Sequence, residues 1–159
     1  MSKKQTVYLE SSVISYQANE IGNDLKTAAE QMITRQWWDI ALPKFQPFIS
    51  GYVLSEVERG VPSESKKRIV LASQFQVLPD NKEIFHLAGE YIKKLSLPKD
   101  GQIDAFHLAM VAIHEIDFLL TWNCKHIANA KKFALIQKIN QANGYSMSTI
   151  CTPRELMEG

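Results

Sequence analysis

Apolar residues in this chain follow two spacings, one typical of short buried strands and one typical of amphipathic helices. In Gln5–Glu10, apolar Val7 and Leu9 flank Tyr8 in the alternation expected of a strand. Asp117–Thr121 (DFLLT) is continuous and apolar, as expected of a central parallel strand. The same signals place shorter strands at Phe45–Ser50, Gln76–Leu78 and Ser148–Cys151.

Between the strands, apolar positions recur near the 3.6-residue period of a helix. Gly101–Glu115 shows this period most strongly, and Pro43 marks the end of another helix. Ser11 and Ser12 are good N-cap residues, so a helix should begin directly after the first strand. The other helices expected from this spacing are Asp24–Leu42, Gly51–Arg59, Ser63–Phe75, Asn81–Leu95 and Lys131–Asn143.

This alternation of strands and helices favours an α/β fold with a mostly parallel sheet. The chain has 159 residues, which is the length of one domain with a substantial core. It contains no internal repeat, low-complexity tract or Gly/Ser-rich linker. We therefore expect a single domain over residues 1–159.

Composition narrows the class of protein only a little. The net charge is +1, so bulk charge neither supports nor excludes nucleic-acid binding. Two cysteines are too few for a secreted disulfide scaffold of this length. No apolar run has the length of a signal peptide after the first residues, and none approaches the roughly 20 residues of a membrane span. We expect a cytoplasmic protein with no membrane segment.

Acidic residues occur where a parallel sheet usually binds ligands, beyond the carboxyl ends of its strands. Glu10 ends the first strand, Glu56 lies on the helix after the second, and Asp104 begins the helix before Asp117–Thr121. Right-handed crossovers would bring these carboxylates to one edge. A cluster of this kind needs a cation to offset its repulsion, and oxygen ligands suit Mg²⁺ or Mn²⁺.

The physical case for a metal ligand differs among the three acids. Glu10 could be solvated or could cap the following helix, where the helix dipole favours a carboxylate. The spacing alone does not distinguish Glu56 from Glu58. Asp104 has the strongest physical case, since a lone acid on an otherwise apolar helix is costly unless it is paired or ligated.

Neighbouring residues could extend this edge. His107 shares a helix face with Asp104, and a hydrogen-bonded, partly buried histidine is the better interpretation than a metal ligand. Cys124 and His126 look like part of a zinc site, but without further ligands a structural role is favoured. Asp100 is best explained as a solvated acid near the helix start.

Several segments together carry a resemblance to a known family. They are VYLESSVISY, VLSEVERG, DAFHLAMVAIHEIDFLLTWNCKHIAN and ICTPREL, and they resemble the PIN-domain family, most closely its VapC-like branch. The match runs along essentially the whole chain, and TWNCKHIAN is its most specific block. The resemblance implies a three-layer α/β/α fold with a mostly parallel central sheet and a metal-dependent endoribonuclease activity with Mg²⁺ or Mn²⁺.

The resemblance also assigns roles to individual residues. Glu10, Glu56 and Asp104 stand at the positions of the family's first three acids, which implies metal binding and catalysis. Asn123 stands at a fourth catalytic position where many relatives have an acid. An asparagine can coordinate through its carbonyl oxygen but brings no charge. Small hydroxyl positions that could hold water or phosphate are Ser11, Ser12 and Thr121.

Three hypotheses about function follow. The first is a metal-dependent ribonuclease with RNA as its substrate. The second is the same activity in the toxin of a toxin–antitoxin pair, which adds an antitoxin partner; the resemblance also favours a homodimer. The third is a module that binds RNA or a protein partner without cleavage, because Asn123 removes one charge from the site.

Overall fold

The computed structural model describes residues 3–157, and within them a five-stranded, wholly parallel sheet forms the centre. The strands are β1 (Thr6–Leu9), β2 (Gln46–Ser50), β3 (Gln76–Leu78), β4 (Phe118–Leu120) and β5 (Thr149–Cys151). Their order is β3-β2-β1-β4-β5, so β1 is the central strand. Every expected strand is present, and its bounds lie within one residue of the range expected.

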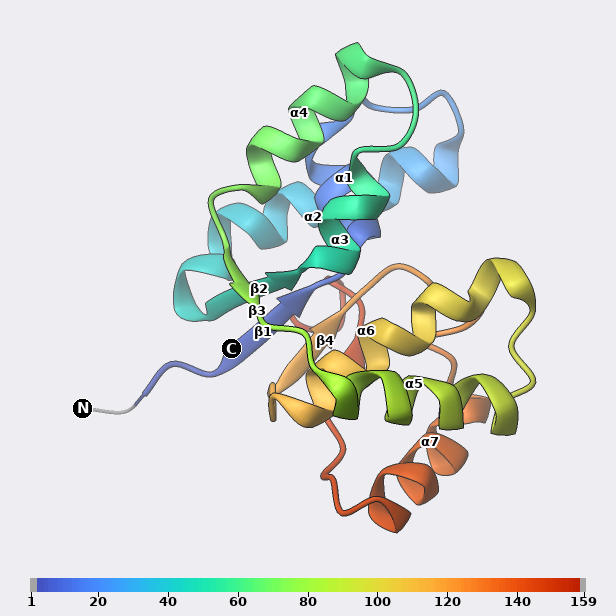
Figure 1. Ribbon diagram of the computed structural model, residues 1–159. Helices are drawn as coiled ribbons and strands as arrows, with labels where there is room; N and C mark the ends of the chain where they lie inside the picture. The colour runs from blue at the N-terminus through green and yellow to red at the C-terminus, as the bar shows by residue number, and fades with distance from the viewer. Residues whose placement is uncertain (1–2, 158–159) are drawn as a thin grey trace.

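Helices cover both faces of the sheet (Figure 1). They are α1 (Ser11–Ala18), α2 (Leu25–Ile40), α3 (Gly51–Val57), α4 (Pro62–Ala72), α5 (Lys82–Lys94), α6 (Gln102–Ile113) and α7 (Ala130–Ala142), with short 3₁₀ turns η1 (Leu42–Lys44) and η2 (Lys99–Gly101). α1–α4 pack together on one face, and α5–α7 pack on the other. The expected three-layer α/β/α fold is confirmed.

Several helix ends differ from the expected ranges by one to three residues. α2 ends at Ile40 rather than Leu42, and α6 ends at Ile113 rather than Glu115. α3 stops at Val57 rather than Arg59, and α4 ends at Ala72, short of Phe75. Gly101 belongs to η2 instead of the helix that follows it. Within residues 3–157, every helix is too short or too polar to span a bilayer.

The direction of the chain across the sheet reverses beside β1. From β1 it moves outward to β2 and β3, then returns to place β4 and β5 on the other side. Leu9 pairs with Leu120, so Glu10 and Thr121 follow side by side at the carboxyl edge. Ligands in open α/β sheets bind at such a reversal point.

The central strand is buried on both faces. Val7, Tyr8 and Leu9 are all inaccessible to solvent, as is Leu119 on the neighbouring β4. Tyr8 therefore places a hydroxyl inside the protein, and that hydroxyl must find hydrogen-bond partners there. Trp37 of α2 is also fully buried, and its ring N–H donates to the carbonyl of Leu156.

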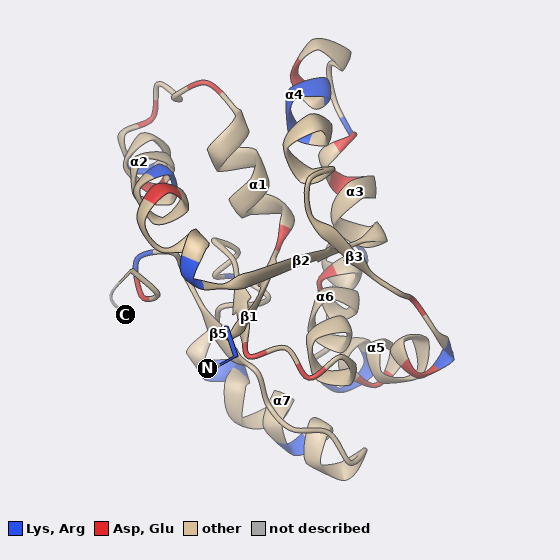
Figure 2. Cartoon of the chain, turned by 90° about the vertical axis from the view of Figure 1, so that its left-hand side faces the viewer, with Lys and Arg blue, Asp and Glu red and all other residues tan. Residues whose placement is uncertain are grey.

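Basic side chains are divided among several elements. In Figure 2, Lys and Arg residues lie on α2, α4, α5 and α7, with acidic residues between them. Basic and acidic residues are almost equal in number, with a net charge of +1. Recognition of an anionic partner must therefore depend on local contacts near a site.

The helices α5, α6 and α7 end in the same way. Each has a bond from the backbone N–H two residues past its C-cap to a carbonyl five residues earlier, which closes a Schellman motif. These bonds are Leu97 to Ile92 at 3.1 Å, Ile116 to Val111 at 3.0 Å and Tyr145 to Asn140 at 2.8 Å. The residue before each donor is left-handed, with φ of 51° at Ser96, 53° at Glu115 and 83° at Gly144.

We expect Ser96→Gly and Glu115→Gly each to stabilise the protein by about 0.5–1 kcal/mol, because only glycine adopts a left-handed φ without a steric penalty. Urea unfolding measures the change. Gly144→Ala is the matched control and should destabilise, although a Cβ at Gly144 meets no atom within 4 Å. A loss of stability in both glycine variants would contradict the explanation.

Candidate metal centre

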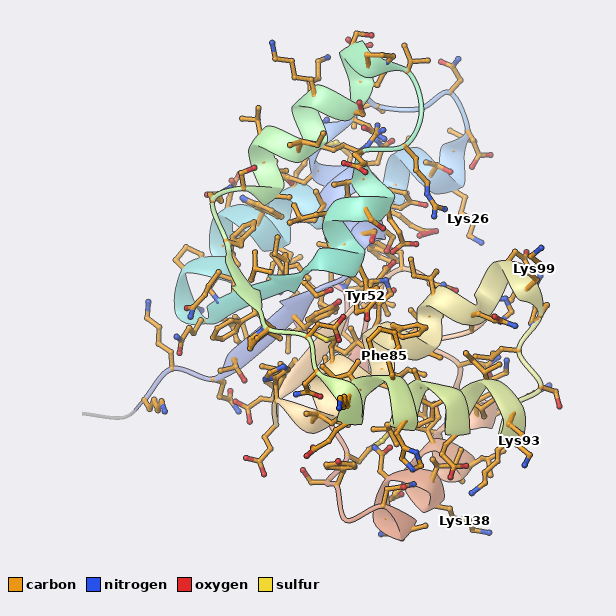
Figure 3. The ribbon with its side chains drawn as sticks, in the orientation of Figure 1. Lys26, Tyr52, Phe85, Lys93, Lys99 and Lys138 are labelled. Atoms are coloured by element: carbon orange, nitrogen blue, oxygen red, sulfur yellow. The ribbon has the colours of Figure 1, made fainter. Side chains whose placement is uncertain are left out.

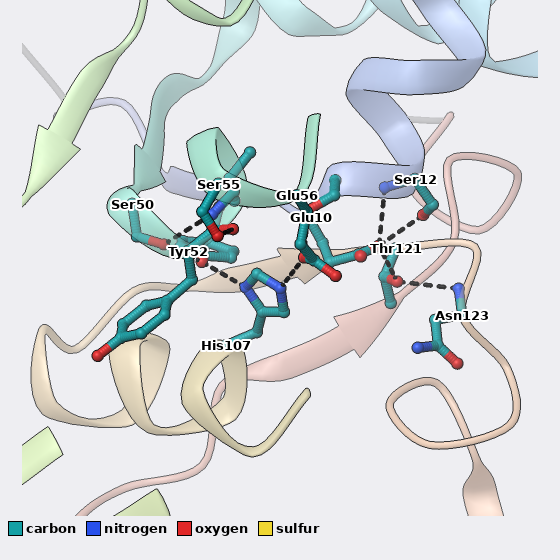
Figure 4. A network of polar contacts seen from close by, with 12 residues as sticks. Glu10, Ser12, Ser50, Tyr52, Ser55, Glu56, His107, Thr121 and Asn123 are labelled. Carbon is teal, nitrogen blue, oxygen red and sulfur yellow. Dashed lines mark hydrogen bonds and ion pairs between the residues drawn. The ribbon is translucent and has the colours of Figure 1, made fainter. Parts of the chain in front are cut away.

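Glu10 sits at the reversal point, immediately after β1, and it caps the N-terminus of α1. One oxygen, Oε1, accepts hydrogen bonds from the Ser12 backbone N–H at 3.2 Å and the Ser12 hydroxyl at 2.5 Å. The same oxygen accepts the Thr121 hydroxyl at 2.6 Å (Figure 4). Glu10 is only 4% exposed, so its position is fixed from both α1 and the end of β4.

The two hydroxyls that hold Glu10 are themselves held by the turn after β4. Ser12 Oγ accepts the Trp122 backbone N–H, and Thr121 Oγ1 accepts the Asn123 backbone N–H, both at 2.9 Å. Each hydroxyl therefore has a donor role and an acceptor role within the protein. The structure gives them the task of orienting a carboxylate, while their contact with substrate stays a prediction.

Glu56 projects from α3 toward the same edge. Its Oε1 accepts the Ser11 hydroxyl at 2.5 Å and also lies 2.6 Å from Nε2 of His107. Glu58, which spacing could not separate from Glu56, is exposed at the C-cap of α3. The geometry thus selects Glu56 as the acid of the site.

His107 is fully buried and uses both ring nitrogens. Nε2 pairs with Glu56, and Nδ1 lies 2.6 Å from the hydroxyl of Tyr8. That hydroxyl lies 2.6 Å from Ser50 Oγ at the end of β2. The interpretation of His107 as a hydrogen-bonded histidine is confirmed by these contacts, although its burial is complete rather than partial.

Glu56 and His107 form an ion pair in which His107 is buried and Glu56 is partly exposed. Burial by itself would raise the pKa of Glu56, but the hydrogen bond and charge of His107 outweigh it and lower the pKa. Burial would likewise lower the pKa of His107, yet the bond to Glu56 and the charges of Glu10, Glu56 and Asp104 raise it. Each partner therefore favours the charged form of the other.

Asp104 lies in the first turn of α6 and is 5% exposed. The pKa of Asp104 is raised to about 6, chiefly by burial; the charges of Glu10 and Glu56 also raise it, whereas His107 and Asn123 lower it. All three predicted carboxylates therefore act on one another electrostatically. The structure brings them to one edge, as the topology predicted.

Asn123 is held by hydrogen bonds within the turn after β4. Its Oδ1 accepts the backbone N–H of His126 at 3.1 Å, and its backbone carbonyl accepts the N–H of Ala128 at 2.8 Å. Hydrogen bonding from the Asn123 side chain lowers the pKa of Asp104. Asn123 therefore acts on Asp104 as a neutral polar group, where an acid would add a negative charge.

Three residues important to this geometry escaped the sequence reasoning. Tyr8 and Ser50 complete the bonds around His107, and Gly101 lets the start of α6 approach the turn after β4. A Cβ at Gly101 would lie 3.1 Å from the ring of His126. In the sequence, the available signal was position: Tyr8 and Ser50 are polar residues near strand ends, and Gly101 is a glycine three residues before Asp104.

Other candidates are separate from this cluster. Asp100 is exposed in η2, in agreement with a solvated acid. Cys124 is exposed while His126 is buried, and the group of potential ligands found in residues 3–157 includes neither.

The donor atoms present fit a hard divalent cation. Ligand atoms of Glu10, Glu56 and His107 lie within 4.8 Å of one another. Asp104 is outside this group, although the charges of Glu10 and Glu56 act on its carboxyl. In the described part of the chain, the hydrogen bonds to Glu10 and Glu56 all fall on Oε1, which leaves each Oε2 for another partner. Carboxylate oxygens are the preferred ligands of Mg²⁺ and Mn²⁺.

A parallel sheet whose reversal point gathers carboxylates from β1, α3 and α6 defines an α/β protein with an acidic, oxygen-donor site. The PIN domain family model matches residues 7–132, which is most of the chain. The chain therefore belongs to the PIN domain family, as its motifs indicated. Comparison with curated proteins found no match.

Solved structures of VapC toxins and VapBC complexes share the fold. VapC20 of Mycobacterium tuberculosis, a sarcin-ricin-loop-cleaving toxin, has a TM-score of 0.57 at 14% identity, over 87% of this chain and 95% of its own. VapBC2 of Rickettsia felis, bound to a promoter DNA fragment, has a TM-score of 0.56 at 14% identity. The match covers 93% of this chain and 98% of the other. VapBC-1 of nontypeable Haemophilus influenzae has a TM-score of 0.55 at 16% identity. The match covers 94% of this chain and 99% of the other.

Asp104→Asn should stabilise the metal-free protein at pH 7.5 by about 1–3 kcal/mol. The folded-state pKa of about 6 exceeds the ordinary value of 3.8, so the folded protein binds this proton more tightly. The wild-type protein therefore loses stability as pH rises through about 6, whereas the Asp104→Asn protein, whose side chain carries no titratable proton, does not. Urea unfolding in EDTA measures this advantage, which should disappear near pH 4; an advantage independent of pH would contradict the assignment.

Removing His107 should be costly. His107→Ala leaves Glu56 and the Tyr8 hydroxyl without their buried partner, so we expect a loss of about 3–5 kcal/mol in unfolding free energy. His86→Ala, an exposed histidine on α5, is the control and should change little. Equal effects of the two substitutions in urea unfolding would show that the ion pair is unimportant.

Proposed function

We propose that this protein is a divalent-metal-dependent endoribonuclease that acts in the cytoplasm. The observation that carries the proposal is the cluster of Glu10, Glu56 and His107 ligand atoms at the reversal point of a PIN-domain sheet, with Asp104 near enough for the charges of Glu10 and Glu56 to act on it. Three carboxylates share this edge with the single positive charge of His107, so an added cation would reduce the repulsion that His107 leaves uncompensated. Their placement at the binding edge of the sheet therefore supports a metal site with a chemical purpose.

Each residue has a defined part in this proposal. Glu10, Glu56 and Asp104 would hold Mg²⁺ or Mn²⁺, which when bound supplies an activated water and stabilises charge developing on a phosphodiester. Ser11 keeps one oxygen of Glu56 in place, and the Asn123 side chain lowers the pKa of Asp104. The hydroxyls that orient Glu10 are those of Ser12 and Thr121.

His107 would determine how Glu56 is presented. Its Nε2 engages Oε1 of Glu56, and the Tyr8 hydroxyl prevents the ring from turning. Both bonds fall on Oε1, so Oε2 of Glu56 would remain available to a metal ion. Such pre-positioned ligands reduce the reorganisation that metal binding requires.

We also propose that the protein is the toxin of a toxin–antitoxin pair. The support is the shared fold with VapC20 and with two VapBC complexes. On this proposal a second protein binds the chain and blocks the acidic site. Homodimer formation, implied by the family resemblance, belongs to the same proposal and is tested by sedimentation.

The alternative is a PIN-like module that binds RNA or a protein partner without cleaving it. One observation favours it: Asn123 stands where many relatives carry an acid, and its Oδ1 is engaged by the His126 backbone. The site then has one ligand charge fewer. Metal uptake and cleavage measured on the same protein separate the two functions.

Wild-type protein should cleave single-stranded RNA with Mg²⁺ or Mn²⁺, and Glu56→Gln should lower the rate at least about 100-fold because a ligand charge is lost. Glu58→Gln is the matched control, since it makes the same chemical change two residues away on an exposed surface. Gel analysis of a labelled RNA panel gives the rates, and calorimetry gives Mn²⁺ affinity.

Three outcomes are informative. Loss of both cleavage and Mn²⁺ binding in Glu56→Gln alone supports the proposal. RNA binding without cleavage by wild type, together with weak metal uptake, supports the alternative. Equal activity of the two variants would remove Glu56 from the site.

A further inference from the structure

Aromatic side chains continue from the acidic site toward α5. Tyr52 precedes Glu56 by four residues on α3, so the two share one side of the helix. Phe106 of α6 packs on Tyr52 with ring centroids 4.8 Å apart and an interplanar angle of 34°. Phe85 of α5 meets Phe106 edge-on at 5.5 Å. Figure 3 shows Tyr52 and Phe85 close together between α3 and α5.

The outer ring of this series is open to water. Phe85 is 58% exposed, although its edge-on contact with Phe106 holds it in place. Single exposed apolar residues are common and need no explanation. Here the exposed ring is continuous with two partly buried rings and, through Tyr52, with the helix that carries Glu56.

A cavity of about 260 Å³ opens beside Tyr52. It is lined by Gly51, Tyr52, Ser55, Leu78, Asp80 and Met110. Leu78 and Met110 are buried and form an apolar floor, whereas Asp80 is exposed at the rim. Because α3 follows β2 and Asp80 follows β3, the cavity lies at the same carboxyl edge as Glu10.

The cavity has one hydrogen-bonding wall. The Tyr52 hydroxyl donates to Oδ2 of Asp80 at 2.6 Å, and the Asn81 backbone N–H donates to Oδ1 at 2.9 Å. A carboxylate has about four lone-pair sites, so Asp80 can accept further bonds from a ligand. As an anion it repels phosphate and attracts N–H groups.

We propose that this cavity and the rings of Tyr52, Phe106 and Phe85 form a nucleobase-binding site. The site takes one base of single-stranded RNA while a neighbouring phosphate lies at the acidic centre, so the proposal rests on the proposed function. Unpaired bases are commonly held by stacking on aromatic side chains. Asp80 accepts from an exocyclic amino group, which cytosine has and uracil lacks.

Gly51 provides a direct test. A Cβ at this position meets no atom within 4 Å and Gly51 lines the cavity, so Gly51→Leu is expected to fill part of the cavity. Phe85→Ala removes the exposed ring. Ile40→Ala is the control, because Ile40 is 59% exposed at the end of α2, which leads to the opposite edge of the sheet.

Binding is measured with a short cytidine-rich single-stranded RNA that carries 2-aminopurine, whose fluorescence falls when it stacks. The Asp104→Asn protein is used as the background, with Mg²⁺ present, so that the RNA is not cut. We expect Gly51→Leu and Phe85→Ala each to weaken binding about tenfold, or about 1.4 kcal/mol, and to reduce the quenching. Ile40→Ala should bind as the background does, and Asp80→Ala should reduce the preference for cytidine over uridine.

The outcomes separate this proposal from the nuclease proposal. Equal RNA affinity in Gly51→Leu, Phe85→Ala and Ile40→Ala overturns the base site, even if wild type cleaves RNA. Quenching that depends on Phe85 and Gly51, in a wild-type protein that cuts nothing, supports the base site and removes the nuclease. A Phe85→Ala protein that changes only its sedimentation overturns the base site and identifies the rings as a contact between copies.

Discussion

The ion pair of His107 and Glu56 is the interaction on which the acidic site depends. Carboxylates this close together repel one another, and burial strengthens the repulsion because little water screens it. His107 brings the compensating positive charge to the centre of the cluster. The hydrogen bonds that pass through it join β2, β1, α6, α3 and α1 in a single series: Ser50, Tyr8, His107, Glu56 and Ser11.

This series also explains how a short helix holds a functional group steadily. α3 has only seven residues, and Glu56 lies in its last turn. Such a helix has little stability of its own in water. Contacts from both layers, Ser11 on one side and His107 on the other, fix the side chain that the helix cannot fix alone.

The sequence was sufficient for the sheet and for the three acids, because both follow from strand pattern and strand order. The partners of His107 could not be predicted, since Tyr8 looks like an outward residue of an alternating strand until both faces of β1 are known to be covered. The role of Asn123 depends on which atom faces the turn, and one sequence does not contain that information. Similarly, Ser96 and Glu115 carry no sign of the left-handed conformation that ends their helices.

The close contact between Gly101 and His126 has a consequence for engineering. A Cβ at position 101 would lie 3.1 Å from the imidazole, so a larger residue there requires the His126 ring to shift. A protein engineer who varies position 101 alone therefore works against this contact. A library that also offers smaller side chains at position 126 removes the contact and gives the start of α6, which carries Asp104, more freedom.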